Sequence, residues 1–313
     1  TKNGFGQYIP KQVLQRHSVL ASGTLMLSAL GAHQVKLGFE FEDNLSDNTR
    51  KYTGTDFDPN DRFAGRITYS TDATGEQLRI NRGFALPREF NRFGDAGVKC
   101  GTGDGRYCYN YFRAVTETRN YALYLRDNWS LSFVPGLTVN AGVRWEAQEI
   151  FAADGSKQIS LYDNIAPRVG LVYDPTRNGR SKISVNYGRF YQSVPMDIND
   201  RAFGGEGLLV GRGFTPDCAK RPLTPNGKAL PVPEVGPGAA CSLTDPRVAG
   251  GGTFAPVAPG LKGQYIDAFV AGAEYDVGFD IVLGASYTYR TLGSIIEDLS
   301  VNGGDTYFIA NPG

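Results

Sequence analysis

Four cysteines are the residues whose type and spacing could form covalent links in this chain of 313 residues. Cys100 and Cys108 make one local pair, and Cys218 and Cys241 make another. Four cysteines allow three connectivities, and the sequence does not choose among them. Local pairing is the simplest because each pair closes a short loop, whereas a zinc site would need closer spacing or nearby histidines. We therefore predict two disulfides, Cys100–Cys108 and Cys218–Cys241, and an oxidising compartment.

No set of side chains in the sequence matches a known catalytic or metal-binding pattern. GxSxG, HExxH, P-loop and EF-hand motifs are all missing from the sequence. Only His17 and His33 could serve as the base of a nucleophilic site, and both fall at the ends of predicted strands. Asp56, Asp58 and Asp61 lie in one predicted loop. Their carboxylates are the best candidates in the sequence for oxygen ligands of a Ca²⁺ ion, an alternative to a chain without a metal site. We predict no enzymatic activity, no metal and no cofactor.

The composition favours strands and excludes a nucleic-acid partner. The 32 basic and 32 acidic residues balance, whereas a protein that binds nucleic acid carries a basic excess. There are 40 Gly, 17 Tyr and 18 Phe but only 2 Met, a balance that favours strands and loops over helices. The mean hydropathy of −0.29 does not exclude a membrane barrel, since half of each barrel strand is polar. The apolar stretch 18–32 is too short for a helical span, so we interpret it as a strand.

Long segments of the chain alternate strictly between apolar and polar residues. In the segment 137–148, one face would carry Leu137, Val139, Ala141, Val143, Trp145 and Ala147, and the other face Thr138, Asn140, Gly142, Arg144, Glu146 and Gln148. Successive side chains of a strand point to opposite faces, so this pattern gives one continuous apolar band. Strands of ~9–11 residues or more with one apolar face match a tilted span of a lipid bilayer.

The alternation predicts ten strands joined by short and long connections in turn. The predicted strands are 17–30, 34–44, 64–72, 76–86, 115–133, 137–152, 164–174, 182–193, 264–276 and 279–291. The long connections are 45–63, 87–114, 153–163 and 194–263. This pattern is typical of an antiparallel up-and-down transmembrane β-barrel, with short turns on the periplasmic side and long loops outside. Both cysteine pairs then fall in extracellular loops.

The two faces of each strand predict which side chains meet lipid and which meet the lumen. Apolar side chains and terminal aromatics such as Trp129, Phe133 and Trp145 would contact outer-membrane lipid, because aromatic rings suit the headgroup level. The polar face would line the lumen, and we predict lumen-facing positions for Arg126, Asn140, Arg144, Glu146, Arg168, Asn186 and Arg290.

Three stretches of the sequence resemble TonB-dependent outer-membrane receptors. Within that family they are most similar to the Oar-like branch. They are RNYALYLRDNWSLSFVPGLTVNAGVRWEAQ, NIAPRVGLVYDPTRNGRSKISVNYGRFYQSVP and QYIDAFVAGAEYDVGFDIVLGASYTYRTLGSIIED. The similarity covers most of 115–313 well and 1–114 loosely. It rests on the Asp-Asn-Trp, Gly-Val-Arg-Trp-Glu and Ala-Pro-Arg-Val-Gly patterns, which occur in that order.

The resemblance implies a barrel of twenty-two strands in the outer membrane of a Gram-negative bacterium. It also implies an N-terminal plug, a TonB box and active transport driven through the TonB complex, of which neither the plug nor the box is visible here. We therefore interpret residues 1–313 as part of the barrel, with an unknown substrate bound by the extracellular loops. The alternatives are a passive channel without a plug, a surface-binding barrel, an outer-membrane enzyme and a soluble sandwich that binds glycans.

Overall fold

A computed structural model describes the residue ranges 7–52, 66–71, 77–87, 98–99, 106–109, 111–213, 245–251, 253–300 and 307–312. Within these ranges the chain is built almost entirely of antiparallel strands, with one short helix. That helix is neither long enough nor apolar enough to cross a membrane, and the described residues contain no other that is.

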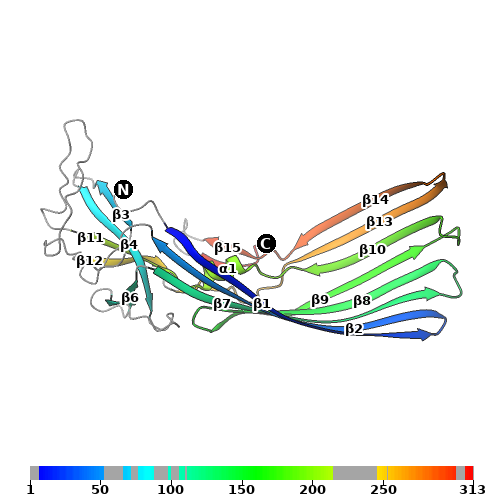
Figure 1. Cartoon of the computed structure of the whole chain (residues 1–313), viewed down its shortest axis with the longest axis horizontal. Coiled ribbons are helices and arrows are strands. Elements are labelled where there is room, and N and C mark those ends of the chain that lie inside the picture. Colours follow the sequence, from blue (N-terminus) through cyan, green and yellow to red (C-terminus); the bar gives the residue numbers. More distant parts are fainter. Residues whose placement is uncertain are drawn as a thin grey trace.

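Eight strands form one curved sheet, which we call the main sheet. In spatial order they are β1 (Gln7–Ser28), β2 (Gly31–Tyr52), β7 (Tyr111–Leu131), β8 (Leu137–Phe151), β9 (Lys157–Tyr173), β10 (Ser181–Tyr191), β13 (Tyr265–Gly278) and β14 (Ile281–Gly293). Each strand runs antiparallel to its neighbours, which confirms the predicted up-and-down order (Figure 1). In the described residues no pairing joins β1 to β14, so the sheet is an open arc and not a closed barrel.

Short turns join the strands at one end of the main sheet, on the right of Figure 1. Phe279 and Asp280 link β13 to β14 with φ of 57° and 60°, as a two-residue hairpin turn requires. Gly136 has a φ of 89° in the turn between β7 and β8, a backbone conformation that glycine adopts without steric cost. The period-two pattern and these turns together fix the register of each hairpin.

Six other strands form a second sheet at the opposite end of the chain's long axis (Figure 1). They are β3 (Arg66–Thr71), β4 (Gln77–Pro87), β5 (Val98–Lys99), β6 (Arg106–Tyr109), β11 (Gly207–Gly213) and β12 (Asp245–Gly251). Their order is β12-β11-β4-β6-β5, with β3 beside β4. The predicted strands at 64–72 and 76–86 therefore exist, but their assignment to the barrel is wrong.

The cause of this error is that β2 pairs directly with β7. The two strands stay in register along their whole length, from Gly31 opposite Leu131 to Lys51 opposite Tyr111. This long ladder leaves β3 to β6 outside the main sheet as one insertion. The predicted loop 45–63 therefore begins too early in the sequence, because β2 runs to Tyr52. The predicted loop 87–114 ends too late, because β7 already starts at Tyr111.

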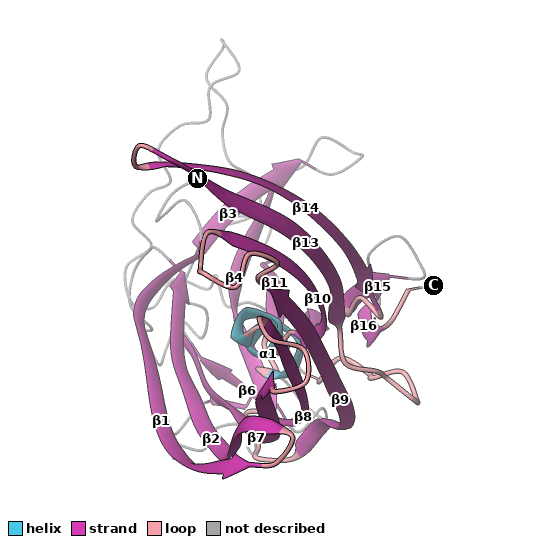
Figure 2. Cartoon of the chain, turned by 90° about the vertical axis from the view of Figure 1, so that its right-hand side faces the viewer, coloured by secondary structure: helices cyan, strands magenta, loops and turns pink. Residues whose placement is uncertain are grey.

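The predicted loop 194–263 contains regular structure as well. Its helix α1 (Met196–Phe203) packs against β2, β7 and β8, and Figure 2 shows it inside the curve of the main sheet. Its strands β11 and β12 belong to the second sheet. The small hairpin of β15 (Glu297–Ser300) and β16 (Tyr307–Ala310) lies beyond β14. A buried apolar cluster joins α1 to β8, β9 and β16, and it includes Ile150, Leu161, Phe203 and Ile309.

The main sheet has two chemically different faces. We call the face that carries α1 the inner face and the opposite one the outer face. Thr116 and Thr118 of β7 contact α1, so residues of even number on this strand belong to the inner face. Leu123 and Leu125, of odd number, are 47% and 48% exposed on the outer face. The alternation predicted from the sequence is therefore present, with large apolar side chains exposed on one face.

Candidate functional site

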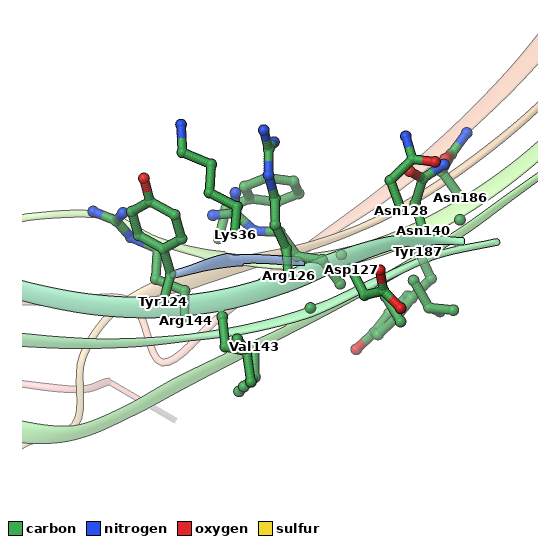
Figure 3. A pocket seen from close by; sticks show the side chains of 18 of the residues that line it. Lys36, Tyr124, Arg126, Asp127, Asn128, Asn140, Val143, Arg144, Asn186 and Tyr187 are labelled. Atoms are coloured by element: carbon green, nitrogen blue, oxygen red, sulfur yellow. The ribbon is translucent and has the colours of Figure 1, made fainter. Parts of the chain in front are cut away.

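A cavity of about 1060 Å³ lies along the inner face of the main sheet, and residues of all eight strands line it. Figure 3 shows the arrangement from close by: Lys36, Tyr124, Arg126 and Asn128 project from one side of the sheet. Val143 projects from the other side, as its odd position on β8 requires. The cavity therefore belongs to the polar face of the strands.

Most of the lumen-facing residues predicted from the sequence are brought together in this cavity. Six of the seven line it: Arg126, Asn140, Arg144, Arg168, Asn186 and Arg290. The seventh, Glu146, accepts a hydrogen bond from Nε of Arg144 at 2.5 Å. Lys36 and Glu40 also line the cavity, and the alternation of 35–41 places both of them on the polar face of the segment.

Four cations of the cavity lie in one row across the sheet. The strand registers align Lys36, Arg126, Gly142, Arg168, Gly188, Ala268 and Arg290 as successive cross-strand neighbours from β2 to β14. We call the four charged members, Lys36, Arg126, Arg168 and Arg290, the cation belt. Within the described residues, none of these four forms an ion pair with a carboxylate within 4.0 Å.

The glycines of this row make room for the aliphatic stems of the neighbouring arginines. A Cβ atom added at Gly142 would lie 3.0 Å from Cβ of Arg126, and one at Gly188 would lie 3.5 Å from Cγ of Arg168. The Arg168 guanidinium also lies over the Phe190 ring, with its Cζ 4.5 Å from the ring centroid. Aliphatic stems and an aromatic ring thus hold the cationic heads along the cavity wall without neutralising them.

A row of amides lies beside the belt, toward the short turns. Gln34, Asn128, Asn140 and Asn186 belong to one level of the strand register, with Gly170 between the last two. All four amides line the same cavity. Amide groups both donate and accept hydrogen bonds, so this level of the wall is polar and uncharged.

On the other side of the belt, toward α1, the charges neutralise each other. Arg144 donates from Nη2 to Glu40 at 2.6 Å and from Nε to Glu146 at 2.5 Å. Its Cζ lies 5.7 Å from the centroid of the Tyr124 ring, which itself covers Gly38. An arginine between two carboxylates carries no free positive charge to the cavity. Arg144 therefore differs from the four cations of the belt.

Buried polar contacts fix α1 to the inner face. Asp200 is 6% exposed and accepts hydrogen bonds from Ser46 Oγ at 2.7 Å and from Thr116 Oγ1 at 2.5 Å. Asn199 donates to Thr118 Oγ1 at 3.3 Å. Hydrogen bonds to a buried carboxylate are charge-assisted and strong. Sequence reasoning missed this contact, because a helix of eight residues is too short for its apolar positions to repeat over several turns.

Near the short turns, the outer face carries the acidic residue Asp127 among apolar ones. The structure gives it a partner: Nδ1 of His33 lies 2.6 Å from Oδ2 of Asp127. The His33 ring stacks on Trp129 with the ring centroids 5.0 Å apart. This group lies next to the short turn between β1 and β2, where His33 Nε2 is 3.0 Å from the carbonyl oxygen of Ala29.

The remaining candidate residues are not placed by the structure. Cys100, Cys218 and Cys241 lie outside the described residues, as does the side chain of Cys108 in β6, so the predicted disulfides stay predictions. The three acidic residues of 56–61 also lie outside the described ranges. In the described part of the chain, no three His, Cys, Asp or Glu side chains form a group that could hold a metal ion.

Comparisons with known proteins place the chain in a family. A family model described as TonB dependent receptor-like, beta-barrel, matches residues 6–313. The TonB-dependent transporter Oar of Myxococcus xanthus is 31% identical over 323 aligned residues, which cover 98% of this chain. The chain spans 28% of the length of that relative.

Similar solved structures include two proteins named as transporters. The FrpB iron transporter from Neisseria meningitidis (F3-3 variant) is 10% identical, with a TM-score of 0.41, covering 96% of this chain and 45% of its own. The toluene transporter TodX from Pseudomonas putida is 12% identical, with a TM-score of 0.23, covering 91% of this chain and 75% of its own. Because these TM-scores are low, the assignment rests on the sequence matches: the chain belongs to the TonB-dependent receptor family and carries part of its β-barrel.

Proposed function

We propose that this chain is the part of a TonB-dependent outer-membrane receptor that forms one side of its transport barrel. The complete protein moves a substrate across the outer membrane of a Gram-negative bacterium with energy supplied through the TonB complex. The family match over residues 6–313 carries this proposal. The polar inner face and apolar outer face of the main sheet support it, since a transport barrel needs both.

The outer face supports a position for the bilayer. Large apolar side chains are exposed there on neighbouring strands, among them Leu37, Leu125, Val143, Val169 and Tyr287. Farther from the short turns, the same face carries ion pairs. Arg113 binds both carboxylate oxygens of Asp47 at 2.8 Å, and Arg119 pairs with Glu117 at 2.5 Å. Ion pairs of this kind fit the water-exposed wall beyond an apolar band that is about 25 Å tall.

The strand lengths agree with that position. With 22 residues, β2 spans about 70 Å when extended, far more than the bilayer requires. We propose that the short turns lie on the periplasmic side and that the far ends of β1, β2 and β7 extend outside the cell. The second sheet and α1 then belong to the extracellular side, where we expect the unknown substrate to bind first.

The open edges of the main sheet support a larger barrel. Within the part of the chain that the structure describes, β1 and β14 each pair with a strand on one side only. In a bilayer no water replaces the missing hydrogen bonds, and each unpaired backbone group costs several kcal/mol. We propose that these eight strands are part of a twenty-two-stranded barrel whose lumen is lined by Arg126, Asn140, Arg144, Glu146, Arg168, Asn186 and Arg290. The TonB complex would act through a plug inside that lumen.

The proposal can be tested on the full-length protein in cells. We expect it to fractionate with the outer membrane and to form a cross-link to TonB that disappears when the TonB box is deleted. A deletion of equal length in a surface loop is the matched control and should leave the cross-link intact. A protein that fractionates with the outer membrane but never cross-links to TonB would favour the passive channel and refute active transport.

A further inference from the structure

We propose that the cation belt binds small anions that carry two or more phosphate or carboxylate groups, and that such anions are the substrate class of this barrel. Lys36, Arg126, Arg168 and Arg290 form the binding row. The assignment of a substrate class rests on the proposed transport function. The assignment of a binding site rests only on the belt.

The first reason is that the belt puts like charges side by side. Lys36 and Arg126 are direct cross-strand neighbours, and Arg126 and Arg168 are separated only by Gly142. Like charges directly opposite each other on one face of a sheet are destabilising. A carboxylate at this level would remove the repulsion, as Glu40 and Glu146 do for Arg144 in the adjacent row. The described strands offer none in the belt's own row.

The second reason is the space between the cations. Gly142 separates Arg126 from Arg168, and Gly188 and Ala268 separate Arg168 from Arg290, so the three arginines stand apart along the wall. Two strands that flank a third lie about 10 Å apart. Long arginine side chains from such strands can converge on one anion, and each guanidinium can bind a phosphate or carboxylate through two parallel hydrogen bonds. The row therefore suits a ligand with several anionic groups better than a single halide.

The third reason is the composition of the rows on either side. The row toward the short turns supplies neutral amides from Gln34, Asn128, Asn140 and Asn186, which can donate further hydrogen bonds to an anion. In the row toward α1, the charge of Arg144 is already neutralised. Glu40 acts electrostatically on Arg168, but its hydrogen bond goes to Arg144. The uncompensated positive charge of this cavity is thus confined to one level.

A binding experiment on the full-length protein in detergent tests this site. The probes are pyrophosphate and citrate, each titrated calorimetrically at low and at moderate salt. We expect both to bind, and the Arg126→Gln, Arg168→Gln double variant to bind at least about tenfold more weakly. Raising the salt should weaken binding by the wild type more than binding by this variant, because screening acts on the charges that the variant lacks.

Matched variants separate a binding role from a folding role. Lys182 is an inner-face cation of the same sheet, but it is paired with Glu274 at 3.5 Å, so Lys182→Gln should bind the probes like the wild type. The Arg126→Lys, Arg168→Lys double variant keeps the charge and should recover part of the affinity lost in the glutamine variant. All variants are compared as folded barrels, by the shift in gel migration that heating causes.

Two results would overturn the inference. One is a wild-type protein that binds neither probe, which would mean that another part of the full-length protein neutralises the belt. The other is equal binding by the wild type and the Gln double variant. Neither result touches the cross-link to TonB, so the transport proposal can stand without the anion site. Conversely, probe binding by a protein that never engages TonB would leave the site in place and remove the substrate assignment.

Discussion

At the scale of single residues, the alternation of the sequence correctly predicts which side chains share a face. Arg126, Arg144 and Arg168 were assigned to one face from position alone, and they line one cavity. The alternation is a local signal, because each residue's direction follows from its neighbours in the strand. The pairing of His33 with Asp127 is not local, since the two residues come from different strands. In the sequence, Asp127 stands among apolar residues at the odd-numbered positions of 123–133, and no local pattern points to His33 as its partner.

The two faces of β8 predict opposite responses to a new charge. Val143 is 45% exposed on the outer face, and Asn140 lines the inner cavity. A charge in the lipid-facing band costs ~2–4 kcal/mol near the bilayer centre, so Val143→Arg should impair folding far more than Asn140→Arg. The yield of heat-modifiable barrel in the outer membrane measures this for the full-length protein. Equal tolerance of both substitutions would count against the face assignment.

The turn between β9 and β10 predicts a dependence of stability on pH. The Asp174 carboxylate accepts hydrogen bonds from Thr176 Oγ1, Ser181 Oγ and the Gly179 amide, which hold the pKa of Asp174 well below its usual range. Because the pKa of Asp174 is lower in the folded state, its carboxylate stabilises that state at any pH above the unfolded-state pKa of about 3.9. This stabilisation is lost as the pH falls from there toward the folded-state pKa. We expect the Tm to fall more between pH 5 and pH 3 in the wild type than in Asp174→Asn. An identical pH dependence in both proteins would contradict this role of the carboxylate.

The cysteines predict local disulfides in the extracellular segments. Cys100 should pair with Cys108, and Cys218 with Cys241, because each bond closes a short loop. A non-reduced proteolytic digest analysed by mass spectrometry measures the connectivity. Free thiols, or a peptide that joins Cys108 to Cys218, would exclude the local pairing.

At the scale of elements, the sequence predicts strands better than it predicts their partners. The segments 64–72 and 76–86 do form strands, yet they pair in the second sheet. Their alternation shows that they are extended, but it holds no information on which distant strand they meet. The pairing of β2 with β7 determines that β3 and β4 lie outside the main sheet. These two paired strands are separated in the sequence by the insertion that contains β3 to β6. The helix α1 was missed for a related reason: tertiary contacts to β2 and β7 hold it, not a periodic pattern of its own.

The attachment of α1 predicts the effect of one substitution. Asp200 accepts hydrogen bonds from hydroxyls of β2 and β7 while almost fully buried. Asp200→Ala leaves both hydroxyls without their acceptor, which costs roughly 1–3 kcal/mol for each unsatisfied buried group. We expect faster hydrogen exchange in the peptide 196–203 of the full-length protein. Asp197, in the first turn of the same helix, provides the control substitution Asp197→Ala. Unchanged exchange in Asp200→Ala would mean that the apolar cluster alone fixes α1.

At the scale of the whole molecule, the arc of eight strands has the architecture that the match to a β-barrel family requires. An up-and-down sheet with an apolar outer face and a charged inner cavity has the architecture expected for part of the β-barrel of this family. This architecture could be predicted from the sequence because every barrel strand repeats the same local alternation of apolar and polar residues. The total number of strands, the plug and the substrate depend on residues beyond those patterns, so they stay proposals.

The gel migration of the isolated chain tests the central claim most directly. A folded barrel in detergent migrates differently before and after boiling, and closure requires partners for the free edges of β1 and β14. We predict that residues 1–313 expressed alone aggregate or fail to insert and show no heat-dependent shift, whereas the full-length protein shows one. A heat-dependent shift of the isolated chain, with β1 paired to β14 in a small closed barrel, would contradict the account of these strands as one side of a larger receptor.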